Sequence, residues 1–145
     1  MKQLLNQDLD LVNATDANGF TPLHSACQNN LLKVVKAFEE QLVLEKVLEA
    51  QSRENNTPLH IACLNGDAAL DIVNFLIKKN ANIHAANKNG ETPIHISASG
   101  GHKQLTDILL EKGADVNVLD AEGRTPVVLA VIGDHEPVVS LLLPQ

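Results

Sequence analysis

Two pairs of histidine and cysteine are the residues of this chain whose types and spacing could do chemistry. His24 stands three residues before Cys27, and His60 stands three residues before Cys63. On a helix, residues three apart share a face, so each imidazole could lie beside a thiol and activate it as a nucleophile. The same four side chains are also the ligand types of a two-cysteine, two-histidine structural zinc site. The spacing therefore raises two chemical hypotheses, a Cys-His dyad and a zinc centre.

A structural explanation competes with both hypotheses. The two pairs hold equivalent places in successive segments, and Ala98 holds the cysteine place in a third, which indicates a position for a small packing residue. Zinc bonds are about 2.0 to 2.3 Å long, whereas packed helices lie about 8 to 10 Å apart, too far for neighbouring helices to share one ion at equivalent positions. The same spacing exceeds the roughly 7 Å that disulfide Cα atoms allow. The sequence therefore predicts two free, buried thiols.

Other signs of catalysis are absent from the sequence. It contains no glycine-rich phosphate loop, no paired catalytic carboxylates and no Gly-x-Ser-x-Gly nucleophile motif. His102 and His135 follow the turn between two expected helices, where we expect helix-capping residues rather than metal ligands. The sequence predicts that the chain is not an enzyme, with no catalytic residue, no cofactor and no metal ion.

The elements that position these residues begin at a recurring four-residue phrase. It reads Thr-Pro-Leu-His at residues 21–24 and 57–60, Thr-Pro-Ile-His at 92–95, and Thr-Pro-Val-Val at 125–128. The steps between copies are 36, 35 and 33 residues. A period of this length is typical of a solenoid, in which each unit buries its apolar face only by stacking on its neighbours.

Each copy predicts the start of a helix. The Thr hydroxyl can cap free N–H groups, and Pro suits the first helical position because its missing donor costs nothing there. Asn18-Gly19, Asn89-Gly90 and Glu122-Gly123 precede three of the copies and predict tight turns with positive φ. Gly113 predicts the left-handed end of a later helix, and Asn80 takes the same role in another segment.

These residues resemble the ankyrin repeat, whose period is about 33 and whose phrase is Thr-Pro-Leu-His-x-Ala. The resemblance covers essentially the whole chain, and residues 87–119 follow the family pattern most closely. It implies an all-α repeat solenoid of antiparallel helix pairs, each followed by a β-hairpin loop, around a concave groove. In this family the repeated His is expected to bond backbone groups of adjoining turns.

The resemblance also predicts where the repeats begin and end. We expect a single ankyrin-repeat domain over residues 1–145, in which the last repeat is truncated or acts as a cap. Because its end is apolar at 141–143, the chain is either part of a longer array or imperfectly capped. The predicted units are an N-terminal half-repeat at 1–15 and repeats at 16–51, 52–86, 87–119 and 120–145.

Two insertions interrupt the period. About three extra residues fall near 41–48, where helical spacing predicts a longer outer helix or a longer loop after it, and two fall at Asp67-Ala68 between two helices. Surface loops tolerate such drift. The alternative is that the first insertion forms a ligand-specific bulge at the edge of the stack.

Composition narrows the partners and the compartment. The net charge is -7 and only three residues are aromatic, which argues against binding of nucleic acid or anionic lipid. No apolar run approaches the roughly 20 residues of a membrane span, and the first residues lack the apolar core of a signal peptide. We expect a cytoplasmic protein, with the nucleus or a host-cell cytosol as alternatives, that is monomeric on its own.

The resemblance places function on a surface that binds a protein partner. Hairpin tips and the exposed side of the inner helices are expected to make the contact, because Thr, Pro, Leu, His and Gly are used in folding. Large exposed apolar residues and arginines are the strongest candidates for contact energy. The predicted partner-binding residues are Phe20, Arg53, Glu54, Leu64, Lys88, Glu91, Leu119, Arg124 and Ile132.

Three narrower hypotheses accompany this prediction. Asn117 lies in a stretch that resembles ankyrin hairpins hydroxylated on Asn, which makes it a candidate modification site. The longer early repeat and the acidic balance resemble inhibitors of Rel/NF-kappa-B-type transcription factors. Eroded repeats also occur in bacterial or viral ankyrin effectors that act on host proteins. The partner's identity is not written in the repeated residues.

Overall fold

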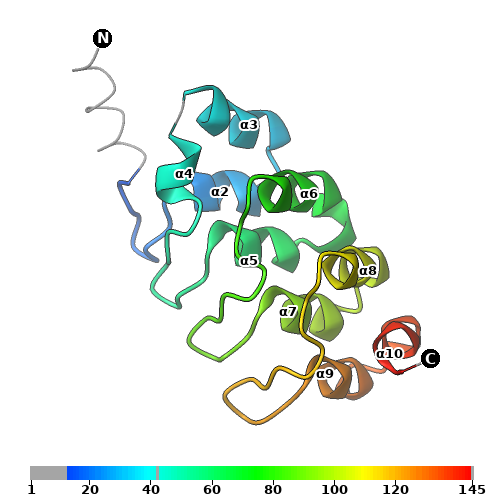
Figure 1. The fold of residues 1–145 in the computed structure, drawn as a ribbon. Coiled ribbons are helices and arrows are strands. Elements are labelled where there is room, and N and C mark those ends of the chain that lie inside the picture. The colour runs from blue at the N-terminus through cyan, green and yellow to red at the C-terminus, as the bar shows by residue number, and fades with distance from the viewer. Residues whose placement is uncertain (1–12, 42, 145) are drawn as a thin grey trace.

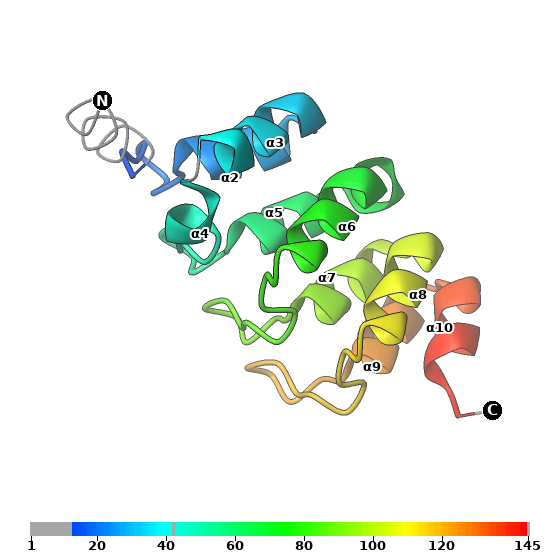
Figure 2. The ribbon, with the colours of Figure 1, turned by 45° about the horizontal axis from the view of Figure 1, so that its top comes forward.

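Antiparallel helix pairs stacked in one row make up the fold (Figure 1). The computed structural model describes residues 13–41 and 43–144. Figure 2 shows the pairs as successive layers, running from α2 and α3 to α9 and α10. The inner helices are α2 (Pro22–Gln28), α5 (Pro58–Leu64), α7 (Pro93–Gly100) and α9 (Pro126–Ile132), and the outer helices are α3 (Leu32–Glu40), α6 (Leu70–Lys78), α8 (Lys103–Glu111) and α10 (Glu136–Leu142).

The predicted helix starts are confirmed. Thr21 is the N-cap of α2, and its hydroxyl accepts a hydrogen bond from the His24 backbone N–H at 3.4 Å. In return, the Thr21 backbone N–H donates to His24 Nδ1 at 3.1 Å. Thr57 and His60 make the same reciprocal pair in α5. The repeated phrase is thus a capping box in which an imidazole replaces the usual acidic side chain.

A continuous apolar core runs between the inner and outer helices. The residue two places after each Thr of the first three copies is buried: Leu23, Leu59 and Ile94. Leu105 and Leu109 of α8 are fully buried opposite them, one helical turn apart. Each repeat therefore contributes one layer to a single core, as the solenoid period predicts.

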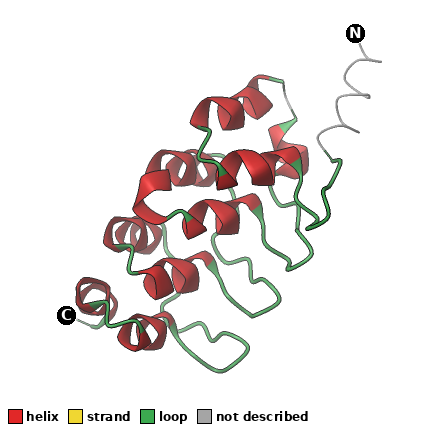
Figure 3. Ribbon diagram, turned by 180° about the vertical axis from the view of Figure 1, so that it is seen from behind, coloured by secondary structure: helices red, strands yellow, loops and turns green. Residues whose placement is uncertain are grey.

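Loops on one side of the stack connect each outer helix to the next inner helix (Figure 3). The resemblance implied β-hairpins here, but the described residues contain no strand. Each loop is instead closed by a hairpin-type backbone bond, such as Asn87 N to Glu91 O at 3.0 Å. One such bond per loop is too short a pairing to form a strand.

The tight turns before the Thr-Pro copies have the predicted positive φ. Gly90 has φ 71°, and Asn55 takes the equivalent place in the second loop with φ 60°. A Cβ on Gly90 would lie 2.5 Å from the backbone N of Ala121, so glycine is also required for the close approach of the next loop. Asn80 has φ 74° after α6, as its position predicted.

The first insertion forms a short helix of its own, α4 (Leu44–Val47). The outer helix α3 ends at Glu40 and is not lengthened, so the extra residues lie in the connection that follows it. Val43 and Leu48, at the ends of α4, are buried in the same core as Leu44 and Val47. The apolar side chains of α4 thus extend the core.

The second insertion forms a 3-10 turn, η1 (Gly66–Ala69), between α5 and α6. The Asp67 carboxylate accepts a hydrogen bond from the backbone N–H of Leu105, 3.0 Å away in the first turn of α8. The Ala68 carbonyl accepts one from the Asn30 side chain, 3.0 Å away in the preceding repeat. The two inserted residues therefore tie the second repeat to both of its neighbours. Of the half-repeat predicted at 1–15, residues 1–12 lie outside the described part.

Candidate protein-binding surface

The repeated histidines use both ring nitrogens within the fold. His24 Nδ1 accepts from the Thr21 backbone N–H, so Nε2 carries the proton and donates to the Asn56 carbonyl at 2.8 Å. His60 Nε2 donates in the same way to Glu91 O at 2.9 Å, and His95 Nε2 to Arg124 O at 3.0 Å. Each imidazole thus bonds the loop of the next repeat, as the resemblance implied.

The two cysteines are free and buried, as their spacing predicted. Burial raises the pKa of the Cys27 thiol to about 12 and raises the pKa of Cys63 as well. A thiol in this state is a poor nucleophile and a poor metal ligand. Across 13–41 and 43–144, no three His, Cys, Asp or Glu residues are grouped so that they could hold a metal ion.

His102 and His135 are not capping residues in the way we expected. They stand at the N-cap positions of α8 and α10, but neither side chain makes a cap hydrogen bond. The His135 ring reaches back and donates from Nε2 to Ser99 O at 3.0 Å. The His102 ring lies against Gly66 and Gly100, where an added Cβ would come within 2.1 and 2.4 Å of it. Both imidazoles therefore pack on a neighbouring turn, which the glycines leave open.

Hydrogen bonds between neighbouring loops hold the ends of these loops, here called the hairpin tips, in one row. Arg53, Glu54 and Lys88 lie on these tips with exposed side chains. The bonds join Arg53 N to Asn18 O at 3.0 Å, Lys88 N to Glu54 O at 2.9 Å, and Ala121 N to Asn89 O at 2.9 Å. Three of the predicted contact residues thus lie together on one edge, carried by a bonded row of loops.

Arg124 is held within its own hairpin. Its Nε donates to the buried Asp120 carboxylate at 2.9 Å, and its Nη1 lies 3.4 Å from Glu122 Oε2. Burial alone would raise the pKa of Asp120, but hydrogen bonds from Arg124 and from the Glu122 backbone lower it below its usual value. The Arg124 guanidinium is therefore already paired with carboxylates of its own hairpin.

Phe20 also has a structural contact. Its ring stacks on the His24 imidazole with centroids 5.3 Å apart and planes 21° apart. The side chain is half-buried and packs against the core at the first loop. Phe20 and Arg124 are therefore predicted contact residues whose side chains have partners inside the fold, and Glu91 is a third, through Asn87.

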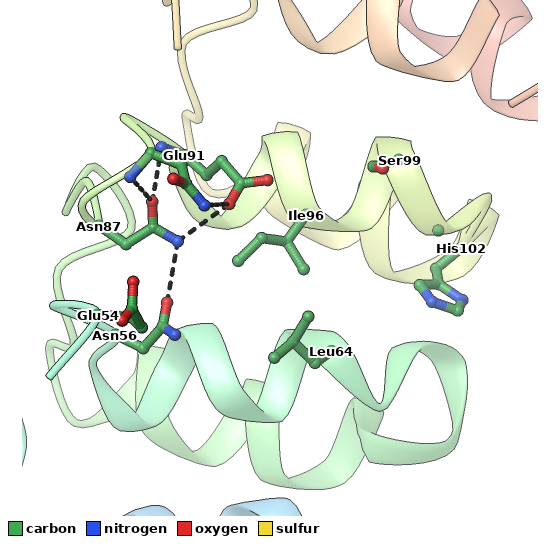
Figure 4. Close-up of a pocket in the computed structure, with 10 residues that line it drawn as sticks. Glu54, Asn56, Leu64, Asn87, Glu91, Ile96, Ser99 and His102 are labelled. Carbon is green, nitrogen blue, oxygen red and sulfur yellow. Dashed lines mark hydrogen bonds between the residues drawn. The ribbon is translucent and has the colours of Figure 1, made fainter. Parts of the chain in front are cut away.

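A groove of about 280 Å³ lies between α5 and α7 (Figure 4). Leu64 stands at one side of it with 59% of its surface exposed, next to Ile96 of α7. Glu54 and Glu91 line its hairpin end, and His102 lines the opposite end. Leu64, Glu54 and Glu91 are thus predicted contact residues that the fold brings to one groove.

Seven lining residues of this groove are not among the predicted partner-binding residues: Asn56, Asn87, Asn89, Ile96, Ser99, Gly100 and His102. Ile96 could have been found by alignment, because the fourth residue after each Thr varies between Ser25, Ile61, Ile96 and Leu129. The role of Asn87 depends on side-chain bonds between loops. No spacing in the sequence signals them.

Ile132 and Leu119 lie away from this groove, with 67% and 59% of their surfaces exposed. Ile132 has the same place in α9 that Leu64 has in α5, and Ser99 of α7 holds the intervening place. Ile132 therefore continues one row along the inner helices, two repeats from Leu64. Leu119 stands between α8 and the last hairpin.

Apolar side chains are also exposed on the last inner helix. Val128 and Val131 are 41% and 60% exposed, although the equivalent His95 and Ala98 of α7 are fully buried. The difference arises because α9 covers α7, whereas α9 itself is the last inner helix of the described stack.

Asn117, the candidate modification site, has an exposed side chain, and its backbone N–H donates to Asp115 Oδ1 at 2.9 Å.

A search for membrane spans over the described residues finds no helix long and apolar enough to cross a bilayer.

Comparison with known proteins identifies the architecture. Residues 1–87 and 68–145 match the family model described as ankyrin repeats, three copies. Human "Ankyrin repeat domain-containing protein 53" is 32% identical over 99 residues, which cover 67% of this chain and 18% of that protein. "Tyrosine-protein kinase HTK16" of Hydra vulgaris is 37% identical over 76 residues, 52% of this chain and 10% of that protein.

A third relative is the "Probable 26S proteasome regulatory subunit p28" of Saccharomyces cerevisiae. It is 30% identical over 102 residues, which cover 70% of this chain and 43% of the relative. The chain thus spans less than half the length of each of these three relatives. The similarity lies in the repeats, and this chain belongs to the ankyrin-repeat family, whose repeats generally mediate protein–protein interaction.

Proposed function

We propose that this chain is a non-enzymatic scaffold that binds a protein partner along its inner helices and hairpin tips. The exposure of Leu64 carries the proposal. This large apolar side chain is 59% exposed at the edge of the groove between α5 and α7. The equivalent Gln28 and Ser99 are polar and exposed, so the fold does not require an apolar residue at this place.

The expected contribution of Leu64 to binding is large for one side chain. Full burial of an exposed leucine contributes about 1.5 to 3 kcal/mol, so burial of the 59% of Leu64 that is exposed contributes about 1 to 2 kcal/mol. Contacts above about 1 kcal/mol are the minority that dominates many interfaces. Ile132 extends the same row and offers a second apolar contact. Arg53, Lys88 and Glu54 at the tips would form the polar rim.

Two features support a reducing compartment such as the cytosol. Both cysteines are free thiols, and both are buried in the core. The narrower hypotheses, a Rel-type inhibitor or a host-directed effector, gain no support from a contact among the described residues and form no part of this proposal.

Quantitative affinity capture tests the proposal. Immobilised wild type, Leu64→Ala and Ile132→Ala would be compared in lysate of the native cell, with mass-spectrometric identification of the bound proteins. The matched control is Leu143→Ala, because Leu143 is a similarly exposed apolar residue at the end of an outer helix. We expect a shared partner to be lost with the first two variants and retained with the control. Unchanged capture by both variants, at unchanged thermal stability, would refute the proposal.

A further inference from the structure

The groove between α5 and α7 combines an apolar floor with an acidic wall. Leu64 and Ile96 form the floor, and the carboxylates of Glu54 and Glu91 stand at its hairpin end (Figure 4). Neither a lysine nor an arginine lines it among the described residues. A ligand that fits must therefore present an apolar surface to the floor and positive charge to the wall.

The Glu91 carboxylate is held in place before any ligand arrives. Asn87 Nδ2 donates to Glu91 Oε1 at 3.1 Å and to Asn56 Oδ1 at 2.9 Å. The backbone carbonyl of Glu91 is fixed separately, because His60 Nε2 donates to it at 2.9 Å. These bonds leave Glu91 Oε2 without a hydrogen-bond partner among residues 13–41 and 43–144. A fixed carboxylate costs less entropy to engage than a freely rotating one.

Nearby cations do not neutralise this wall. Arg124 lies close enough to Glu91 for their charges to interact, but the Arg124 guanidinium is bonded to Asp120 and Glu122. Arg53 and Lys88 are exposed on the tips and do not line the groove. The chain as a whole carries a net charge of -7, which attracts a cationic segment from a distance.

We infer that the groove binds an extended segment of a partner protein in which a lysine or arginine stands next to an aliphatic or aromatic residue. The cationic side chain meets Glu54 and Glu91, and its apolar neighbour covers Leu64 and Ile96. This inference rests on the proposed function and adds the chemistry of the partner.

Selection from a phage-displayed library of random short peptides tests it. Peptides would be selected on the wild-type chain, and their affinities would be measured with fluorescent synthetic copies. We expect enrichment of Lys or Arg beside an apolar residue, and weaker binding at high salt. Glu54→Gln and Glu91→Gln should each weaken binding by about two- to fivefold, the range for exposed ion pairs. Glutamine keeps the acceptor that Asn87 uses, so Glu91→Gln preserves the bonded loop.

The matched control is Glu111→Gln on α8, which removes the same charge from an exposed site outside the groove. It should leave affinity nearly unchanged. Enrichment of acidic or uncharged peptides, no enrichment at all, or equal effects of all three variants would overturn the inference. If the selected peptides lose affinity with Leu64→Ser but not with the glutamine variants, the proposed function stands and only the charge preference fails. Peptides insensitive to both changes would contradict the proposed function as well.

Discussion

His95 of the third repeat donates its Nε2–H to the backbone carbonyl of Arg124, 3.0 Å away in the loop that starts the fourth. The first and second repeats bond the following loops in the same way through His24 and His60. Val128 holds the equivalent place in the fourth copy, so the described stack has three such links.

Substitution His95→Ala should lower the free energy of unfolding by about 1 to 3 kcal/mol, because it leaves polar groups of two loops without their partner. Urea unfolding followed by circular dichroism measures the change. Val128→Ala is the control in the same register, and it should cost well under that amount because Val128 is 41% exposed. Equal losses for the two variants would mean that the histidine link is not what stabilises the junction.

Stability should fall as the pH drops below neutrality. Burial lowers the pKa of His24 and His60 below the ordinary value of 6.5, so the unfolded chain binds protons that the folded chain does not. The stabilisation is complete above about pH 6.5 and is lost as the pH falls from there through the folded pKa, at up to about 1.4 kcal/mol per pH unit for each imidazole. Urea unfolding between pH 7.5 and 5 measures the slope.

A Glu49→Gln background sharpens that measurement. Burial raises the pKa of Glu49, so this carboxyl contributes in the opposite sense in the lower part of the range. Glutamine retains the acceptor for the Asn82 backbone N–H. His60→Gln in this background should make the slope shallower, whereas a flat profile in the parent would contradict the prediction.

Asp67→Ala should destabilise the stack by about 0.5 to 2 kcal/mol, the usual cost of losing a helix cap. The carboxylate of Asp67 caps α8 of the next repeat through the Leu105 N–H, 3.0 Å away. Asp67→Asn keeps an acceptor oxygen and should recover most of the loss in a thermal melt. If alanine and asparagine behave alike and cost nothing, the Asp67 cap does not stabilise the stack, and the insertion bonds only the preceding repeat, through the Ala68 carbonyl.

Gly100→Ala should be unfavourable although alanine is the better helix former. An added Cβ would lie 2.4 Å from the His102 ring, which Gly66 confines on its other side. In a His102→Ala background the clash disappears, and the same substitution should then stabilise by about 0.5 to 1 kcal/mol. Unfolding of the two single variants and the double variant gives the coupling energy. A coupling near zero would show that the ring moves aside freely.

Much of this fold could be predicted from the sequence, because local signals decide where its helices begin and end. Thr21 with Pro22 marks a helix start, and Asn80 marks an end with positive φ, and the structure confirms both. The Asp67 cap and the packing of the His102 ring could not be predicted, since both join residues from different repeats across space. A periodic pattern says that repeats stack, but it does not say which side chain reaches the next one.

The candidate surface, too, could be predicted from the sequence only in part. The exposure of Leu64 could be predicted from the sequence, because the repeat pattern shows which positions do not need to be apolar. The ion pairs of Arg124 with Asp120 and Glu122 could not be predicted from the sequence. Charged residues at these positions fit an exposed contact site equally well. The groove itself depends on how closely α5 and α7 pack.

The bonds between loop tips have a consequence for the speed and cost of recognition. Because Lys88 N is bonded to Glu54 O and Ala121 N to Asn89 O, the tips are already ordered relative to one another in the free chain. A partner that spans several tips need not first freeze a set of independent loops, so little conformational entropy is lost on this side of the encounter. Association can then be governed by diffusion and charge, and the lifetime of the complex by the side chains between the tips.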